Sequence, residues 1–263
     1  MKAHAKINLA LVVGPTLPGG KHEVTTVLQR IGLADWIELE PAPALRVEGF
    51  EGDTLVRRAL ELLADAAHVD PAWAVQIEKE IPVAAGLGGG SSDAAAALRL
   101  ANDALDDPLP TEALRGLAGG LGADIPFFLT EGPQLGEGDG SDLTPLDLPQ
   151  DSTVVVVVPA AESKHSTAAV YAAFDERTGA EGYTGRRAQL VAALDAGDLA
   201  ALPPNDLASS PLAADLRALG AFRADATGAG PAVYGLFEND DAARFAADEM
   251  RSNGRVWVGA PAW

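Results

Sequence analysis

The 263-residue sequence contains no cysteine, and this absence excludes several classes of protein. Without cysteine the chain forms no disulfide framework, no thiolate metal site and no cysteine nucleophile. Its longest apolar runs, such as residues 153–158, are far shorter than the roughly 20 residues that a membrane-spanning helix needs. Lys6 and Asn8 interrupt the apolar N-terminal stretch, so we identify no targeting segment and expect a cytoplasmic protein.

Basic residues are also scarce, because 19 Lys and Arg stand against 38 Asp and Glu, for a formal charge of -19. A negative field repels polyanions, so we expect no binding to nucleic acids or to anionic membranes. The acidic residues are spread over the whole length, as on a solvated surface. Self-repulsion between copies favours a monomer or a weak homodimer. At 48% hydrophobic residues the chain can bury a globular core.

The order of hydrophobic patterns predicts an α+β protein with two domains, residues 1–150 and 151–263. In the first domain we expect mostly strands over the first fifty residues, a helix over 54–68 capped by Asp53, a strand over 73–77, helices over 92–105 and 111–119, and a loop without periodicity over 131–151. In the second we expect strands over 154–158, 222–227, 232–237 and 255–259, and helices over 167–176, 185–196, 210–220 and 240–252.

The segment Pro82-Val-Ala-Ala-Gly-Leu-Gly-Gly-Gly-Ser-Ser-Asp carries the strongest chemical signal. Glycines allow positive φ and a close approach of the backbone to a ligand, while a helix starting at Ser91 and Ser92 points its free N–H groups into the loop. This combination predicts an anion cradle suited to a triphosphate. It is neither a Walker A loop, because no lysine follows the last glycine, nor a dinucleotide fingerprint. The alternative is a glycine-rich turn capped by Ser91 or Ser92.

Three further segments carry polar residues in suggestive places. Lys6 and Asn8 share one face of an alternating strand, where Lys6 could neutralise phosphate charge or hold a catalytic carboxylate ionised; the alternative is an exposed edge strand. Asp124 precedes an apolar strand over 125–129 and could accept a hydroxyl proton in phosphoryl transfer; the alternative is a cap or turn residue. Residues 227–231, Thr-Gly-Ala-Gly-Pro, form a second glycine loop or only a tight β connection.

Together and in this order, these segments resemble the GHMP kinase superfamily. The resemblance is carried by A-K-I-N-L at 5–9, P-x-x-x-G-L-G-G-G-S-S-D-A-A at 82–95, L-G-A-D-I-P at 121–126 and T-G-A-G-P at 227–231. Further matches at 22–26, 136–140, 166–171 and 204–207 favour the branch that phosphorylates the 2-hydroxyl of a cytidine diphosphate alcohol in the non-mevalonate isoprenoid pathway.

The resemblance implies a fold and a set of roles. The N-terminal half is expected to resemble ribosomal protein S5 domain 2 and the C-terminal half to be ferredoxin-like, with both substrates bound between the domains. Lys6 and Asp124 are the expected catalytic residues, with Lys6 close to Asp124 and to the transferred phosphoryl group. ATP is the expected phosphoryl donor, and Mg²⁺ is expected to arrive with the nucleotide. The residues expected to bind ATP are Pro82, Ala84, Ala85, Gly86, Leu87, Gly88, Gly89, Gly90, Ser91 and Ser92. Those expected to bind the acceptor are Asn8, Lys21, His22, Asp124, Tyr171, Thr227 and Gly228.

One position departs from the family pattern. Where the family has D-G-Y-H, this chain has Gly19-Gly20-Lys21-His22, so a lysine stem replaces the aromatic ring expected over the cytosine. A GHMP kinase for homoserine, a mevalonate derivative or a sugar therefore remains an alternative, as does a non-catalytic nucleotide-binding relative. A ribosome-associated protein is disfavoured by the negative charge. His4, His68 and His165 show no metal-ligand spacing, so no metal ligand is predicted.

Overall fold

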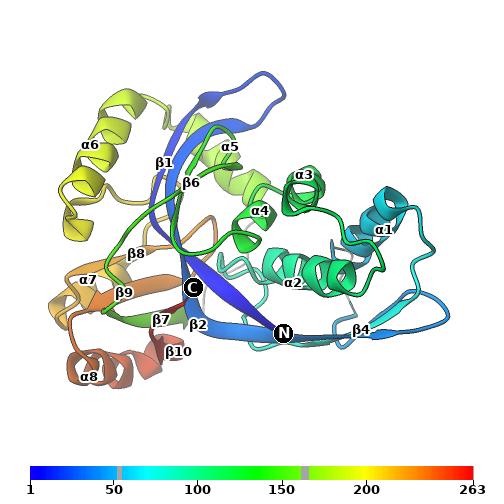
Figure 1. The fold of residues 1–263 in the computed structure, drawn as a ribbon. Helices are drawn as coiled ribbons and strands as arrows, with labels where there is room; N and C mark the ends of the chain where they lie inside the picture. Colours follow the sequence, from blue (N-terminus) through cyan, green and yellow to red (C-terminus); the bar gives the residue numbers. More distant parts are fainter. Residues whose placement is uncertain (52–54, 161–165, 263) are drawn as a thin grey trace. The chain divides into compact units, whose positions relative to one another are not determined.

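The computed structural model describes residues 1–51, 55–160 and 166–262 (Figure 1). They form two compact units: residues 1–5, 33–83 and 88–131 make up the first, and residues 6–32, 84–87 and those from Gly132 onward the second. The predicted domain boundary near residue 150 stays a prediction. Asp53, proposed as a helix cap, and His165 lie outside the described residues.

In its described residues, the first unit combines paired strand segments with helices (Figure 1). The second half of β2 (His22–Pro41) pairs antiparallel with β4 (Trp73–Glu78), and β3 (Arg46–Glu48) pairs parallel with β4, as the alternation predicted. The helices are α1 (Leu55–Ala67), α2 (Gly89–Asp103), α3 (Thr111–Leu121) and α4 (Ile125–Phe128). Helix α1 packs on α2 through an apolar face made of Val56, Ala59, Leu60, Leu63 and Ala64. This packing fixes α2, which follows the glycine segment.

The second unit contains a separate four-stranded antiparallel sheet in the order β10-β7-β9-β8. The strands are β7 (Thr153–Pro159), β8 (Arg223–Ala226), β9 (Val233–Phe237) and β10 (Gly254–Gly259). Helices α7 (Pro211–Ala218) and α8 (Asp240–Met250) share one apolar core with this sheet, around Val155, Leu216 and Phe237. Helices α5 (Thr167–Glu176) and α6 (Tyr183–Asp195) follow β7. This strand order, with a helix in each crossover, confirms the predicted ferredoxin-like half.

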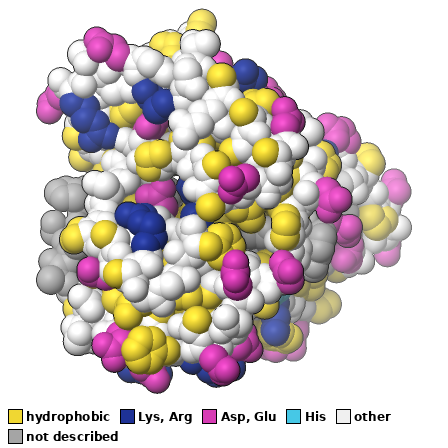
Figure 2. All heavy atoms as spheres, turned by 90° about the vertical axis from the view of Figure 1, so that its left-hand side faces the viewer, with side chains coloured by type: hydrophobic (Ala, Val, Ile, Leu, Met, Phe, Trp, Pro, Cys, Tyr) yellow, Lys and Arg dark blue, Asp and Glu magenta, His cyan; other side chains and the backbone are white. Residues whose placement is uncertain are grey.

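The rest of the second unit extends the pairing of β2. β1 (Lys2–Thr16) and β11 (Pro261–Ala262) pair with β2, and β5 (Gln134–Glu137) lies between β2 and β6 (Asp142–Pro145). The short helical turns η1 (Leu199–Ala201) and η2 (Arg251–Asn253) complete the elements. No helix in the described ranges is long and apolar enough to cross a membrane. On the face seen in Figure 2, Asp and Glu side chains are interspersed with basic and apolar ones, as expected for a solvated acidic surface.

Three expectations from the sequence are wrong. The predicted strand over 125–129 is helix α4, because a short apolar run fits either structure and Pro126 fits the first turn of a helix. The predicted loop over 131–151 contains the hairpin β5–β6, whose pairing with β2 compensates for its weak alternation. Helix α2 begins at Gly89 rather than at Ser92, because Gly88 adopts the left-handed conformation that starts it.

Candidate active site

Lys6 and Asn8 form a buried network in the second unit. Each side chain is only 4% exposed, so the exposed-edge alternative is wrong. Lys6 Nζ donates to Asn8 Oδ1 at 2.6 Å, and Asn8 Nδ2 donates to Thr26 Oγ1 at 2.8 Å. The backbone N–H of Asn8 donates to Thr227 Oγ1 at 2.8 Å, across 219 residues of sequence. The network therefore holds one ammonium group among an amide and two hydroxyls.

The second glycine loop packs directly on Ala85 and Gly86, in the middle of the glycine segment. Ala232 N donates to Ala85 O at 3.1 Å, and a Cβ on Gly86 would lie 2.3 Å from Thr227 O. Gly86 also has φ +88°, which disfavours any side chain. A Cβ on Gly228 would lie 3.4 Å from Lys6 Nζ. The structure thus brings together Lys6, Asn8, Thr227 and Gly228 with Ala85 and Gly86. The loop over 227–231 is therefore a β connection that also contacts the glycine segment.

Helix α2 begins immediately after the glycine segment, within the first unit. Gly88 is its N-cap with φ 71°, and no side chain caps it, so the alternative of a turn capped by Ser91 or Ser92 is wrong. Ser92 N donates to Gly88 O at 2.9 Å, and Ser91 lies in the same first turn. The first N–H groups of a helix have no carbonyl partner within it and favour anions. The start of α2 therefore has the chemistry of a phosphate site.

Three ionisable side chains to which the sequence assigned no role lie beside the start of α2. Lys79 Nζ donates to Asp35 Oδ2 at 2.5 Å and to Asp93 Oδ2 at 2.7 Å. Both carboxylates are buried, with side chains 0% and 3% exposed, and Lys79 is 16% exposed. We call Asp35, Lys79 and Asp93 the Lys79 cluster. Its members are far apart in sequence. The one local signal for the cluster is a lysine that directly follows the predicted strand over 73–77 and its continuation in β4.

Burial dominates the electrostatics of the Lys79 cluster. Desolvation raises the pKa of Asp93 to about 7, because the loss of water outweighs the attraction of Lys79 and the neighbouring Asp35 adds repulsion. Burial alone would lower the pKa of Lys79, but its hydrogen bonds to the two carboxylates raise it. Lys79 thus stays charged, and Asp93 is the group of the cluster that titrates near neutral pH.

The residues expected to bind the cytosine of the acceptor lie around His22, also in the second unit. The His22 and Tyr171 rings are 4.9 Å apart between centroids and tilted by 30°, and His22 Nε2 lies 2.7 Å from Asp175 Oδ1. Lys21 Nζ donates to Asp139 Oδ2 at 2.6 Å, a bond that lowers the pKa of Asp139. His22 and Tyr171 are thus brought together, while the Lys21 ammonium is directed to the turn between β5 and β6.

Asp124 belongs to the first unit, where it is half-buried and forms the N-cap of α4 with φ -79°. Its carboxylate does not cap the helix by a hydrogen bond. Lys6 belongs to the second unit, so the expected pairing of Lys6 with Asp124 stays a prediction. Within residues 1–51, 55–160 and 166–262, no group of three His, Asp or Glu side chains could hold a metal ion.

Asn205 and Asp206 hold the backbone of neighbouring segments of the second unit by hydrogen bonds. Asn205 Nδ2 donates to Ala226 O at 3.2 Å and to Gly228 O at 2.8 Å, which fixes the second glycine loop. Asp206 Oδ2 accepts from Val13 N and from Arg186 Nε, at 2.8 and 3.0 Å. The sequence showed both residues as a match to the superfamily but gave no role for them. Their role follows from hydrogen bonds to distant backbone, which no local pattern encodes.

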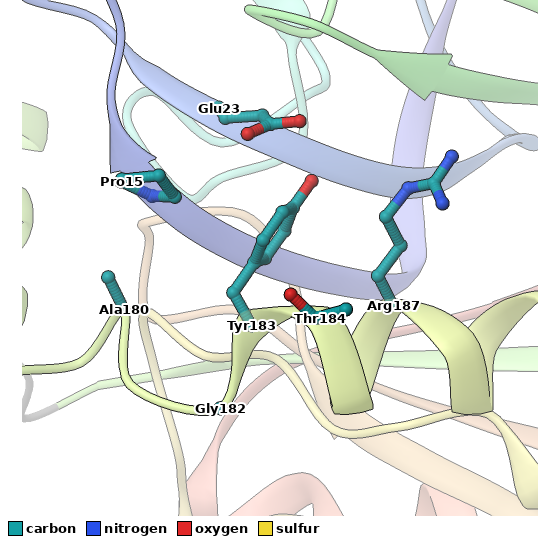
Figure 3. Close-up of a pocket in the computed structure, with 7 residues that line it drawn as sticks. All are labelled: Pro15, Glu23, Ala180, Gly182, Tyr183, Thr184 and Arg187. Atoms are coloured by element: carbon teal, nitrogen blue, oxygen red, sulfur yellow. The ribbon is translucent and has the colours of Figure 1, made fainter.

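A separate open cavity of about 600 Å³ lies at the start of α6 (Figure 3). Glu23 lines it from β2, together with Tyr183 and Arg187 from α6, and the Tyr183 hydroxyl lies 3.1 Å from Thr25 Oγ1. Burial raises the pKa of Tyr183. Glu23 alternates with His22 along β2, so the two side chains point to opposite faces. None of the residues predicted from the sequence lines this cavity.

Comparison with known proteins identifies the family. Residues 54–132 match the model for the GHMP kinases N terminal domain, and residues 208–256 match the model for GHMP kinases C terminal. A 4-diphosphocytidyl-2-C-methyl-D-erythritol kinase of Geobacter sulfurreducens is 37% identical over 99% of this chain and 96% of its own length. The enzyme of the same name from Salinibacter ruber is 36% identical over 95% of this chain and 93% of its own.

Solved structures agree with the sequence relatives. A crystal structure of 4-(cytidine 5'-diphospho)-2C-methyl-D-erythritol kinase superposes with a TM-score of 0.83 at 32% identity, covering 100% of this chain and 99% of the other. A mevalonate kinase from L. major shares the fold, with a TM-score of 0.70 at 19% identity over 99% and 95% of the two chains. The chain therefore belongs to the 4-diphosphocytidyl-2-C-methyl-D-erythritol kinase family of the GHMP kinases.

Proposed function

We propose that this protein transfers the γ-phosphoryl group of ATP to the 2-hydroxyl of 4-diphosphocytidyl-2-C-methyl-D-erythritol. The observation that carries the proposal is the buried network in which Lys6 and Asn8 meet both glycine loops. A protein that only bound nucleotide would need neither a buried lysine nor an acceptor-side network. The near full-length likeness to kinases of that name supports the choice of acceptor.

ATP is the phosphoryl donor in this kinase family, and we assign it to the residues Pro82, Ala84, Ala85, Gly86, Leu87, Gly88, Gly89, Gly90, Ser91 and Ser92. The left-handed Gly86 and Gly88 let the backbone approach the phosphates, and the start of α2 presents N–H groups to them. We propose that Mg²⁺ arrives bound to the phosphates of ATP.

The acceptor is proposed to bind along β1, β2 and the second glycine loop. Asn8, Thr227 and Gly228 would hold the hydroxyl end, because they surround Lys6. His22 would hydrogen-bond the edge of the cytosine and Tyr171 would stack on its face, an arrangement that their ring contact supports. The methylene stem of Lys21 would cover the other face while its ammonium bonds Asp139.

The proposed chemistry is direct in-line transfer. The acceptor oxygen attacks the γ-phosphorus, the bond from that phosphorus to the β–γ bridging oxygen breaks, and ADP leaves. Asp124 accepts the hydroxyl proton, and Lys6 with backbone N–H groups stabilises the charge on the transferred group. No covalent phosphoenzyme forms.

Steady-state turnover with Mg²⁺ and ATP tests the acceptor. We expect selective phosphorylation of 4-diphosphocytidyl-2-C-methyl-D-erythritol over homoserine, mevalonate and galactose. Turnover with one of the other three would refute the acceptor, and binding of ATP without any turnover would support the non-catalytic alternative. Fractionation and sedimentation would test the expected cytoplasmic location and the expected monomer or weak homodimer.

Substitution of Asp124 tests the mechanism. We expect Asp124→Asn to lower kcat by about 10²- to 10⁴-fold with the fold intact, because the amide keeps the shape but accepts no proton. Circular dichroism and single-turnover kinetics measure the two effects separately. Asp103→Asn, at the far end of α2, is the control for loss of an acidic charge. Normal turnover in Asp124→Asn would remove Asp124 from the mechanism.

A further inference from the structure

We propose that Lys79 is a positioning residue of the nucleotide site, which holds the two arms of the glycine segment together by bridging Asp35 and Asp93. The proposal rests on the proposed function, because it concerns the affinity of the same site for ATP. Every contact that carries it lies within the first unit. The Lys79 cluster fixes the chain where it enters the segment and where it leaves it.

The entering arm is fixed by Asp35. Its Oδ1 accepts the backbone N–H groups of Glu80 and Ile81, at 2.7 and 2.8 Å, and its Oδ2 accepts from Lys79 Nζ. Asp35 thus holds three consecutive residues just before Pro82. These are the last residues before the chain enters the loop assigned to the phosphates.

The leaving arm is fixed by Asp93. Its Oδ2 accepts from Lys79 Nζ, and Asp93 lies at the end of the first turn of α2. A Cβ on Gly89, the first residue of this helix, would lie 3.3 Å from Lys79 Nζ. The ammonium group therefore lies beside the helix turn that is proposed to bind phosphate. One side chain joins both ends of the segment.

Stability alone is a weak reason for such a cluster. Burying three charged groups carries a desolvation cost, and well-packed apolar side chains are often as stabilising. One acceptor atom, Asp93 Oδ1, is buried without a hydrogen-bond partner in the described structure. Helices α1 and α4 also pack on α2. Helix α4 has no charged residue, and of the charged residues of α1, Arg58, Glu61 and Asp65 are exposed and Arg57 is half-buried. The cluster thus attaches the first turn of α2, while the hydrogen bonds between Asn102 and Leu109 attach its last turn.

The expected effect follows from population arithmetic. If only a fraction of molecules holds the binding-competent loop, the apparent Kd for nucleotide rises by the inverse of that fraction. Loss of the Lys79–Asp93 bond lets the start of α2 move relative to Lys79. Once ATP is bound, its own contacts order the loop, so kcat at saturating ATP changes little.

The test compares Asp93→Asn with Asp93→Ala by calorimetric titration with MgADP at pH 8. Asparagine keeps an oxygen that accepts from Lys79, and alanine removes it. We expect Asp93→Ala to raise Kd about tenfold, Asp93→Asn to stay within about twofold of wild type, and kcat at saturating ATP to change less than twofold in both. The control is Glu80→Gln, which removes an exposed neighbouring charge outside the cluster.

Each outcome decides the proposal. Equal Kd values for wild type and a folded Asp93→Ala would reduce the cluster to a structural feature, and equal losses in both variants would refute the role of the hydrogen bond. If Asp93→Ala does not fold, the double variant Lys79→Met with Asp93→Asn replaces it, and an unchanged Kd and KM for ATP in that variant would refute positioning by the ammonium. Absence of MgADP binding to wild type would overturn the proposed function itself.

Discussion

The protein buries two lysines in two different ways. Lys6 donates to the neutral amide of Asn8, within a network of hydroxyls, whereas Lys79 donates to the carboxylates of Asp35 and Asp93. The Asn8 amide orients its ammonium group beside the second glycine loop, whereas Asp35 and Asp93 join Lys79 to a strand and to a helix of the first unit. Burial alone therefore does not identify a catalytic lysine; the elements to which its hydrogen-bond partners belong distinguish a group suited to act on a substrate from one suited to hold structure.

The largest expected effect concerns the Lys6 side of the comparison. Lys6→Met should lower kcat by about 10²- to 10⁴-fold, because charge stabilisation of the transferred phosphoryl group is lost. Stability should fall by about 1–3 kcal/mol, because the buried Asn8 amide loses its bond from the ammonium group. Rapid-quench kinetics and urea unfolding measure the two effects, with Lys2→Met, at an exposed position of the same strand, as control. Near-normal kcat would make Lys6 a structural residue.

Lys79→Met should have the opposite effect and lower stability more than it lowers kcat. Removing the ammonium leaves two buried carboxylates without their counter-ion, which costs about 3–5 kcal/mol of unfolding free energy. At pH 8 the double variant Lys79→Met with Asp93→Asn should recover part of this loss, because it removes the cost of keeping the Asp93 carboxyl either charged or protonated above its pKa of about 7. Urea unfolding of the single and double variants provides the measurement. A stability loss below about 1 kcal/mol would show that the two carboxylates do not depend on Lys79.

The pH dependence of stability sharpens the comparison. The pKa of Asp93 is raised from 3.8 to about 7, so the folded state binds this proton more tightly than the unfolded state. The stability that the proton confers is present at low pH and is lost as pH rises through about 7, with a slope of at most about 1.4 kcal/mol per pH unit. Urea unfolding between pH 5 and pH 8 should therefore show a larger loss for wild type than for Asp93→Asn. Parallel curves would contradict the shift.

The smallest expected effect lies outside both lysine sites. Tyr171→Ala should raise KM for the cytidyl acceptor by at most about tenfold, because an aromatic stacking contact contributes about 0.5–1.5 kcal/mol. KM for ATP should not change, and Tyr171→Phe should behave as wild type because it keeps the ring. Initial-rate measurements with each substrate varied in turn test this. A rise in KM for ATP would place Tyr171 with the nucleotide instead.

Local patterns by themselves determined much of this molecule. The alternation over 73–77 and 154–158 predicted strands β4 and β7, and the glycine segment predicted a helix that starts at a ligand loop. The motifs around Lys6, Gly86 and Thr227 identified the superfamily, because residue types in a fixed order are a property of the sequence itself. The same local rules misassigned residues 125–129 and the hairpin β5–β6, where short segments take their structure from their neighbours.

Only the tertiary structure decided which polar residues meet. Asn8 and Thr227 are 219 residues apart and share a hydrogen bond, while Asp35, Lys79 and Asp93 come from a strand, a strand end and a helix. Hydrogen bonds between such distant residues leave no periodic signal in the sequence. Burial, which raises the pKa of Asp93, depends on which elements pack around that side chain. The sequence therefore determined which chemical groups are available, and the fold decided which of them lie close enough to interact.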